Sequence, residues 1–393
     1  MDIVARRSRY KTIEEYRKRP LIVFATSTRL NVNSMMSSDA IREFVDQIDS
    51  IKDGKEVDVL IHSSGGDPLS AWKLMSLLRE RFDNVGVLVP FMAFSAATLF
   101  ALGADDIFMH PHASLGPIDP QIHITQADGS VRRFAYEDVG AFLRFLGKEV
   151  KITEQAHISA VIEKLFTVVD PVNVGAAKRA SELSSAIGER LLLTHMNKGE
   201  DKAKAKQIAE NLNKSFFAHG DAVSRKRAKE LSLKIADSNP TLEKLIWEAY
   251  LGIESYMQLR EPFIPLQLFL ANQAGAASLQ MPGPLSLPPN TPPQLAQQAW
   301  SQLLQQAIQN AANAGIQVPY SIVSAVIEST RAASEFRSVG HLSAIRTQKG
   351  EIQITAVDTE SQWKEVVPPP QPQPAQQQSP GPQPPAPVPQ GVP

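Results

Sequence analysis

A glycine pair and a serine are the residues through which this chain of 393 residues could do chemistry. Gly65 and Gly66 directly follow an apolar stretch, and a glycine pair lets backbone N–H groups approach a ligand because no Cβ intervenes. Ser95 lies 30 residues after Gly65, where a strand is expected to end and a helix to begin. The helix N-terminus would favour negative charge developing near the serine hydroxyl. The spacing therefore fits a nucleophile beside an oxyanion hole, and it also fits an ordinary turn in which Ser95 only caps a helix.

The composition restricts which chemistry is available. The chain has no Cys, which excludes disulfides, thiolate zinc sites and cysteine nucleophiles, so covalent catalysis would have to start from Ser, Thr, Lys or a carboxylate. It has no phosphate-binding loop, no G-x-G-x-x-G and no H-E-x-x-H, and His110 and His112 lack partners at zinc-ligand spacing. We expect no metal and no cofactor.

The charge balance gives no general reason for binding an anionic partner. Lys and Arg number 40 against 41 Asp and Glu, for a net charge of −1. The basic segment SRKRAKELSLK from Ser224 is interpreted as a solvated helix face rather than an RNA site. The charged N-terminus lacks the features of a secretory signal, which predicts a cytoplasmic protein.

Short apolar stretches alternate with helical patterns around the glycine pair and the serine. Strands are expected at Leu21–Ser27, Val57–His62, Val85–Val89 and Ile107–Met109. Helices are expected after Asp39, from Pro68 to Phe82, and from Ser95 onward. This alternation predicts an α/β fold with a mainly parallel sheet and flanking helices. The uncharged stretch Val85–Ala104 is long enough for a membrane span, but Pro90 and the strand–turn–helix pattern favour a buried core segment.

The remainder of the chain predicts further helices and then a change of composition. Helical spacing occurs at Tyr136–Leu146, Ala176–Met196, Asp201–Ser215, Ser224–Leu231, Leu242–Met257, Leu295–Ala314 and Ser321–Phe336. A hairpin is expected from His341–Arg346 and Glu351–Val357. We therefore divide the chain into an α/β domain (1–257), a Pro/Gln-rich linker (258–294), a small helical and hairpin extension (295–366) and a disordered Pro/Gln-rich tail (367–393) that could bind a protein partner.

Three segments together resemble one known family. They are IHSSGGDP from Ile61, LVPFMAFSAATLFALGADDIFMHP from Leu88 and SLGPIDPQI from Ser114, in that order and at close spacing. The set is similar to the serine dehydrogenase proteinase family, a branch of the Clp/crotonase peptidases that is related to signal peptide peptidase A. A weaker similarity continues through FFAHGDAVSRKRAKELSLKI from Phe216, so the resemblance covers about residues 15–257. It implies a Clp/crotonase-like serine peptidase domain.

The resemblance implies a role for each matching residue. Ser95 would attack the scissile carbonyl, and Gly65 or Gly66 together with the N–H of Ala96 would bind the oxyanion. Two positions depart from the family pattern: Ser64 replaces the usual proline, and Ala97 stands where glycine is common. Neither departure removes a reacting group.

The resemblance does not identify a single residue as the general base. Relatives use a Ser-His-Asp triad or a Ser-Lys dyad, and the triad histidine would lie roughly 25 residues after the serine. That region holds Ile118 and Asp119, so Asp119 is expected to brace the turn or a subunit contact. Lys148 and Lys151 lie near the window for a dyad lysine. His157, His219 and Lys164 rank below them.

The leading hypothesis is an ATP-independent serine endopeptidase that forms an acyl-enzyme on Ser95 with peptide or unfolded protein, with a lysine as general base. The resemblance also implies a homo-oligomer. A catalytically inactive Clp-fold scaffold with a partner-binding C-terminal region is the alternative. Acyl-CoA chemistry on the related crotonase fold is a third reading, for which no residue pattern in the chain calls specifically.

Overall fold

A parallel four-stranded sheet forms the centre of the protein. The computed structural model describes residues 2–32, 34–125, 131–197, 199–214, 221–277, 279, 286–287, 292–346 and 351–367. The central strands are β1 (Leu21–Thr26), β2 (Glu56–His62), β3 (Asn84–Val89) and β5 (Asp106–Met109), and each pairs in parallel with the next. All four were predicted within two residues of their observed bounds. The predicted α/β class with a parallel core is confirmed.

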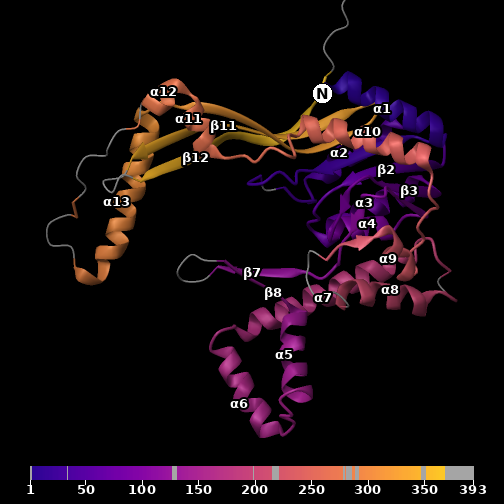
Figure 1. Cartoon of the computed structure of the whole chain (residues 1–393), viewed down its shortest axis with the longest axis horizontal. Helices are drawn as coiled ribbons and strands as arrows, with labels where there is room; N and C mark the ends of the chain where they lie inside the picture. Colours follow the sequence, from indigo (N-terminus) through magenta and orange to yellow (C-terminus); the bar gives the residue numbers. More distant parts are fainter. Residues whose placement is uncertain are drawn as a thin grey trace, which may run out of the picture.

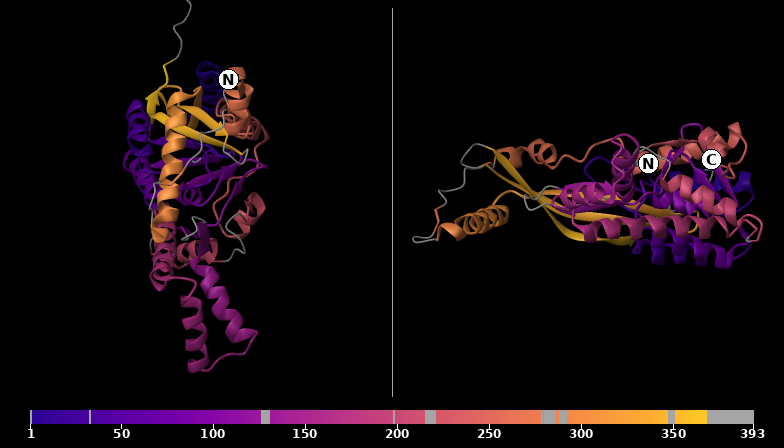
Figure 2. Two further views of the ribbon diagram at one scale, coloured as in Figure 1. Left: turned by 90° about the vertical axis from the view of Figure 1, so that its left-hand side faces the viewer. Right: turned by 90° about the horizontal axis from the view of Figure 1, so that it is seen from below.

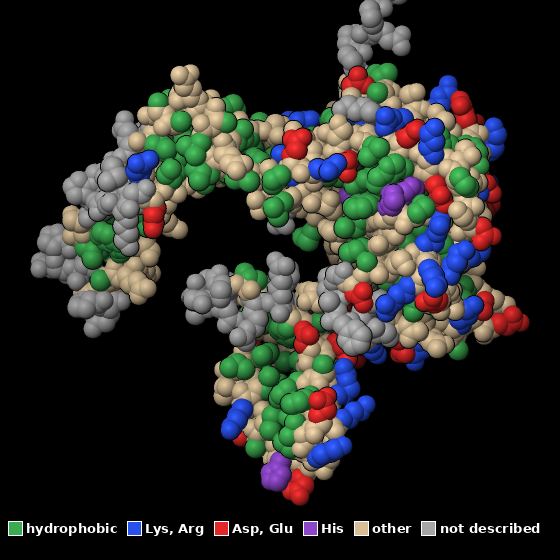
Figure 3. All heavy atoms as spheres, in the orientation of Figure 1, with side chains coloured by type: hydrophobic (Ala, Val, Ile, Leu, Met, Phe, Trp, Pro, Cys, Tyr) green, Lys and Arg blue, Asp and Glu red, His purple; other side chains and the backbone are tan. Residues whose placement is uncertain are grey.

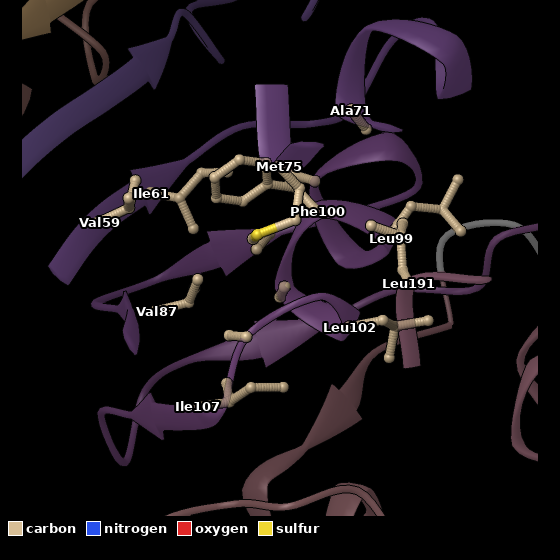
Figure 4. Close-up of a cluster of buried hydrophobic side chains, with 14 of the residues drawn as sticks. Val59, Ile61, Ala71, Met75, Val87, Leu99, Phe100, Leu102, Ile107 and Leu191 are labelled. Carbon is tan, nitrogen blue, oxygen red and sulfur yellow. The ribbon is translucent and has the colours of Figure 1, made fainter. Parts of the chain in front are cut away.

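Helices cover both faces of this sheet (Figure 1). One face is packed by α2 (Ala40–Ser50), α3 (Pro68–Arg81), α4 (Ala96–Leu102) and α7 (Pro171–Leu192). Figure 4 shows Met75 and Phe100 beside the strand residue Ile61, and Leu191 beside Leu99 and Leu102 of α4. Burial of each such side chain stabilises the fold by roughly 1.5–3 kcal/mol. The other face is packed by α1 (Ile3–Arg17) and α10 (Pro240–Tyr256).

Three antiparallel strands extend the sheet beyond β1. They are β10 (Val318–Glu328), β11 (Ala333–Arg346) and β12 (Ile352–Glu365), and the full order is β12-β11-β10-β1-β2-β3-β5. β10 pairs with β1, with Val23 opposite Glu328. The sheet predicted within residues 1–257 therefore takes three further strands from residues 318–365.

The helix predicted at Ser321–Phe336 is wrong, because that segment contains most of β10 and the start of β11. Its apolar residues recur at helical spacing, but Ile322, Val323 and Val326 are β-branched and favour a strand that is packed on both faces. The hairpin predicted after it is confirmed, with His341 opposite Val357.

A buried ion pair joins the two ends of the described chain. The guanidinium of Arg6 on α1 donates to both carboxylate oxygens of Glu328 at the end of β10, at 3.0 and 2.5 Å. The Tyr10 hydroxyl donates to the same carboxylate at 2.8 Å. Arg6 also lies over the Tyr256 ring, 3.7 Å from its centroid. This cluster attaches α1 and α10 to the antiparallel half of the sheet.

The far end of the antiparallel strands carries three helices: α11 (Pro265–Ala271), α12 (Gln273–Ala277) and α13 (Pro293–Ala314). Figures 1 and 2 show this end projecting from the main body. Phe269 and Leu342 centre a separate small core there. The predicted helix at 295–314 is confirmed, whereas two of these helices lie inside the predicted linker (258–294). The predicted tail from residue 368 onward lies outside the described residues.

A second projection extends downward from the body, below the first one (Figure 1). It begins with the hairpin of β7 (Gln121–Thr125) and β8 (Val131–Ala135) and continues as α5 (Tyr136–Lys148) and α6 (Gln155–Phe166). The chain returns along α7 and α8 (Lys202–Lys214) to α9 (Arg225–Glu230). A small sheet of β4 (Met92–Ala93), β6 (Ser114–Leu115) and β9 (Val223–Ser224) lies beside the serine segment. Among the described helices, none is both long and apolar enough to cross a membrane.

Candidate active site

Ser95 occupies a strained turn between strand β4 and helix α4. Its φ of +52° and ψ of −117° place it outside the regions that side-chain-bearing residues normally adopt. Such a conformation costs on the order of 1–3 kcal/mol and persists only where the surrounding structure enforces it. The Leu99 N–H donates to the Ser95 carbonyl at 3.0 Å, and the Ala97 N–H donates to the Phe94 carbonyl at 2.9 Å. The turn thus leads directly into the first turn of α4.

The side chain of Ser95 is half-buried and makes no cap hydrogen bond to α4. This argues against the interpretation of Ser95 as a simple helix cap, because an N-cap serine normally accepts a bond from a backbone N–H of the first turn. Ala97, where glycine is common in the family pattern, is completely buried in the core. The start of α4 accommodates its methyl group.

The glycine pair packs directly against the serine turn. A Cβ on Gly65 would lie 2.6 Å from the Cβ of Ser95 and 2.7 Å from the Phe94 carbonyl oxygen, and Gly65 has a φ of +111°. A Cβ on Gly66, at φ +150°, would lie 2.1 Å from the Met36 carbonyl oxygen. Only glycine satisfies both the conformation and the space at these two positions.

The backbone of Met36 holds the glycine turn from its other side. The Met36 N–H donates to the Gly65 carbonyl at 2.7 Å, and the Asp67 N–H donates to the Met36 carbonyl at 2.8 Å. Asp67 also caps α3, since its carboxylate accepts from the N–H groups of Leu69 and Ser70, as the sequence predicts. The turn is therefore fixed between β2, α3 and the segment before α2.

The backbone donors near Ser95 differ in availability. The Gly65 N–H donates to the buried hydroxyl of Ser63 at 3.1 Å, and Ser63 in turn accepts from the Thr26 hydroxyl at 2.7 Å. The N–H groups of Gly66 and Ala96 donate no hydrogen bond to any residue that the structure describes. Two unengaged backbone donors thus flank the serine turn, one in the glycine turn and one at the start of α4.

The lysines predicted as general base do not lie beside this turn. Lys148 ends α5, and Lys151 follows it in the connection to α6, at the far tip of the second projection (Figure 1). Both are exposed, and neither pairs with a described residue. The structure brings together Ser95, Gly65, Gly66 and Ala96, but within one chain it does not bring either lysine to them.

The lower-ranked bases do not lie beside Ser95 either. His157 and Lys164 are exposed on α6, and the His157 ring lies 3.5 Å from the Glu154 carboxylate. His219 lies outside the described residues. Asp119 accepts a hydrogen bond from the side chain of Gln121 at 3.0 Å, two residues further along the chain.

His62 is a buried titratable group that the sequence interpretation passed over. It ends β2, is completely buried, and packs against the rings of Tyr250 and Phe91 at 5.0 and 6.1 Å between centroids. Its Nε2 lies 3.1 Å from the Thr28 hydroxyl. Burial lowers the pKa of His62 to about 4, so the ring is neutral near pH 7. Its place directly after the apolar residues Leu60 and Ile61, three residues before Gly65, was the available signal.

His62 faces the α10 side of the sheet, whereas Ser95 opens α4 on the other side. His110 and His112 cluster with Trp247 of α10, and the His110 ring stacks on the indole at 4.9 Å. Within the described part of the chain, no group of three or more His, Asp or Glu side chains is arranged to hold a metal ion.

Comparison with known proteins agrees with the sequence motifs. The family model of ClpP-like SDH-type serine proteinases matches residues 5–140, which include the glycine pair and Ser95. Two uncharacterized proteins of Methanocaldococcus jannaschii are similar in sequence. One is 30% identical over 204 residues, covering 52% of this chain and 59% of the relative, and the other is 26% identical over 194 residues, covering 49% and 56%. The chain therefore spans less than two thirds of the length of the curated relatives that it matches.

Solved structures with similar folds are more distant. The membrane-bound stomatin-specific protease 1510-N aligns with a TM-score of 0.33 at 15% identity, over 54% of this chain and 79% of that protein. ClpP1 from Listeria monocytogenes aligns with a TM-score of 0.32 at 13% identity, over 59% and 97%. These scores are too low to carry an inference, so the assignment rests on the sequence match. By that match, residues 5–140 of the chain are similar to the ClpP-like SDH-type serine proteinases.

Proposed function

We propose that the chain is a serine peptidase that hydrolyses peptide bonds through an acyl-enzyme on Ser95. The observation that carries the proposal is the strained Ser95 turn packed against Gly65, with unengaged N–H groups of Gly66 and Ala96 on either side. Strained backbone at a nucleophile is a recurrent feature of functional sites. The match of residues 5–140 to a serine proteinase family supports the same reaction class.

In this reaction the general base accepts the Ser95 hydroxyl proton while the Ser95 Oγ bonds to the scissile carbonyl carbon, and the carbonyl oxygen becomes an oxyanion. The N–H groups of Gly66 and Ala96 would donate to that oxyanion, whereas the Gly65 N–H is already engaged by Ser63. The C–N bond then breaks, and the amine leaves with a proton from the general base. Water hydrolyses the resulting ester and regenerates Ser95.

The proposed general base is Lys148 or Lys151. Because both lie at the tip of the second projection, they can reach a Ser95 only if that projection docks on another copy of the chain or moves. Exposed apolar side chains on the same projection favour docking: Leu143, Phe145 and Val150 are each more than 40% exposed, and Figure 3 shows apolar side chains gathered there. The proposal therefore includes a homo-oligomer in which one copy completes the site of another.

The substrate class follows from the site itself. A serine nucleophile with a two-donor oxyanion site acts on acyl groups, and we propose extended or unfolded peptide as the substrate, without ATP and without a metal or cofactor. A cytoplasmic location is part of the same proposal.

Labelling with a fluorophosphonate probe tests the proposal directly, because the probe bonds covalently to an activated serine. We expect the wild-type protein to be labelled and Ser95→Ala to be unlabelled while both give the same circular dichroism spectrum. A folded wild-type protein that resists labelling and does not cleave peptides would favour the inactive scaffold instead.

A further inference from the structure

Thr98 is a buried polar residue in α4, three residues after Ser95. It is completely buried, and its hydroxyl oxygen lies 2.7 Å from the Ala93 carbonyl oxygen, 3.0 Å from the Gly116 carbonyl oxygen and 3.0 Å from the Gly116 nitrogen. We propose that Thr98 is a positioning residue, whose hydroxyl holds the Ser95 turn in its reactive geometry against the Gly116 segment. This inference rests on the proposed function, since it concerns the same serine.

The hydrogen bonds of Thr98 join two segments that approach Ser95 from different strands. A hydroxyl has one proton, so Thr98 donates to one carbonyl at a time while its oxygen accepts from the Gly116 N–H. The Ala93 carbonyl is the nearer acceptor, and Ala93 is the second residue before Ser95. Gly116 directly follows β6. Thr98 thus continues the link between β4 and β6 beyond their last paired residues, Ala93 and Leu115.

The same two segments are in direct contact beside the serine. A Cβ on Gly116 would lie 2.8 Å from the Cγ of Phe94, so the Phe94 ring packs on the Gly116 backbone. The Phe94 N–H donates to the Ser63 carbonyl at 3.0 Å. Residues 93 and 94 are therefore held both by the Gly116 segment and by the start of the glycine turn, and Ser95 takes its strained conformation immediately after them.

Loss of the Thr98 hydroxyl would remove the hydrogen bonds that hold Ala93 and Gly116 next to each other. The Gly116 N–H and the Ala93 carbonyl would be left without that partner in a buried place, which disfavours the native arrangement of both segments. Since Ser95 has a positive φ that costs free energy, a small rearrangement of residues 93 and 94 would relax the turn and displace the Ser95 Oγ and the Ala96 N–H together. Displacements of this size in reacting groups strongly reduce rate.

Two pairs of proteins isolate the hydroxyl: wild type against Thr98→Val, and Thr98→Ser against Thr98→Ala. The measurements are the maximal rate of fluorophosphonate labelling of Ser95, and kcat and KM for a peptide, at a temperature where circular dichroism shows each protein folded. We expect the hydroxyl-free member of each pair to lose about 10-fold or more in labelling rate and kcat, with KM changed less than about 3-fold. Thr98→Ser should recover most of the wild-type rate.

Ser181→Ala is the matched control, because Ser181 is also buried and its hydroxyl donates to the Asn213 side chain at 2.7 Å, between α7 and α8. It should lower the melting temperature and leave the labelling rate of the folded protein unchanged, which is the pattern that a merely structural role of Thr98 would give.

Equal labelling rates within both pairs would overturn the positioning role and leave the peptidase proposal standing. If the folded wild-type protein is not labelled at all, the peptidase proposal fails and the role of Thr98 fails with it. Should Thr98→Val not fold, the comparison of Thr98→Ser with Thr98→Ala decides alone, since these two differ by one oxygen atom.

Discussion

Arg6 and Glu328 are 322 residues apart in sequence and form an ion pair through two hydrogen bonds, at 3.0 and 2.5 Å, with side-chain exposures of 1% and 0%. Burial and the pairing act in opposite directions on the guanidinium, and the net effect raises the pKa of Arg6. Arg6 therefore stays charged at neutral pH, and its buried charge lies directly against the Glu328 carboxylate.

Glu328→Gln should accordingly destabilise the protein by roughly 3–5 kcal/mol, because it removes the negative charge that is paired with the buried guanidinium of Arg6. Urea unfolding followed by circular dichroism measures the effect. Arg42→Ala is the control: it removes an exposed pair with Asp46 and should change the free energy of unfolding by less than about 1 kcal/mol. A similar small effect from Glu328→Gln would contradict the picture of a buried pair.

Gly65→Ala should abolish labelling of Ser95. The added Cβ would lie 2.6 Å from the Cβ of Ser95 and 2.7 Å from the Phe94 carbonyl oxygen, so the two turns must separate. Gly54→Ala provides the comparison, since Gly54 also has a positive φ, +93°, but a Cβ there would meet nothing within 4 Å. Gly54→Ala should cost about 1 kcal/mol of stability and keep full labelling. A labelled, active Gly65→Ala would show that the two turns need not touch.

Stability should fall below pH 6.5 because of His62. Its pKa is about 4 in the folded protein against 6.5 as the ordinary value, and burial is the cause. Between these pH values the unfolded chain binds a proton that the folded protein does not, so the free energy of unfolding decreases as the pH falls. The loss approaches its full size, on the order of 3 kcal/mol, near pH 4.

His62→Phe keeps an aromatic ring beside Tyr250 and Phe91 and should remove this part of the pH dependence. The comparison requires urea titrations of both proteins between pH 4.5 and 7.5. Parallel curves for the two proteins would mean that His62 does not titrate in this way.

The proposed base can be tested by mixing variants. Lys→Arg keeps the charge but supplies no neutral amine, so at the true base it should abolish turnover in a folded protein. We expect this for Lys148→Arg or Lys151→Arg, and no effect for Lys11→Arg on an exposed face of α1. Lys side chains that act as bases have a lowered pKa, so wild-type activity should rise with pH between 6 and 10.

If the base comes from another copy, Ser95→Ala mixed with the inactive Lys variant and reassembled should regain activity, because some mixed pairs hold an intact serine beside an intact lysine. Neither variant alone should show it. Full activity of both Lys148→Arg and Lys151→Arg would exclude the dyad in this form and direct attention to His157, Lys164 and His219.

The sequence predicted the parallel core well because each of its signals is local. The apolar stretch before Gly65, the Asp67–Pro68 helix start and the uncharged segment around Ser95 all report on neighbours a few residues away. The same segments predicted that Ser95 and the glycine pair lie together. The spacing of the residues could not decide whether Gly65 or Gly66 supplies the oxyanion donor. The structure distinguishes them because the Gly65 N–H donates to the Ser63 hydroxyl.

The misplaced elements depend on distant partners. β10 was predicted as a helix because its stability as a strand comes from β1, some 300 residues earlier. Helix α1 was not predicted, since its charged sequence hides the buried positions Arg6, Tyr10 and Ile13, and Arg6 pairs with Glu328, which is distant in sequence. The position of the α5–α6 projection relative to Ser95 likewise has no local signal in the sequence.

Because β10 lies between β1 and β11, the sheet is complete only after the C-terminal strands have been synthesised. A nascent chain that has emerged only as far as residue 257 has all four parallel strands, but the N–H and C=O groups along one side of β1 have no neighbour until residues 318–328 leave the ribosome. Such an unpaired edge is a template for association with other chains. Residues 1–257 expressed alone should therefore expose this edge of β1 and form aggregates that the full chain avoids.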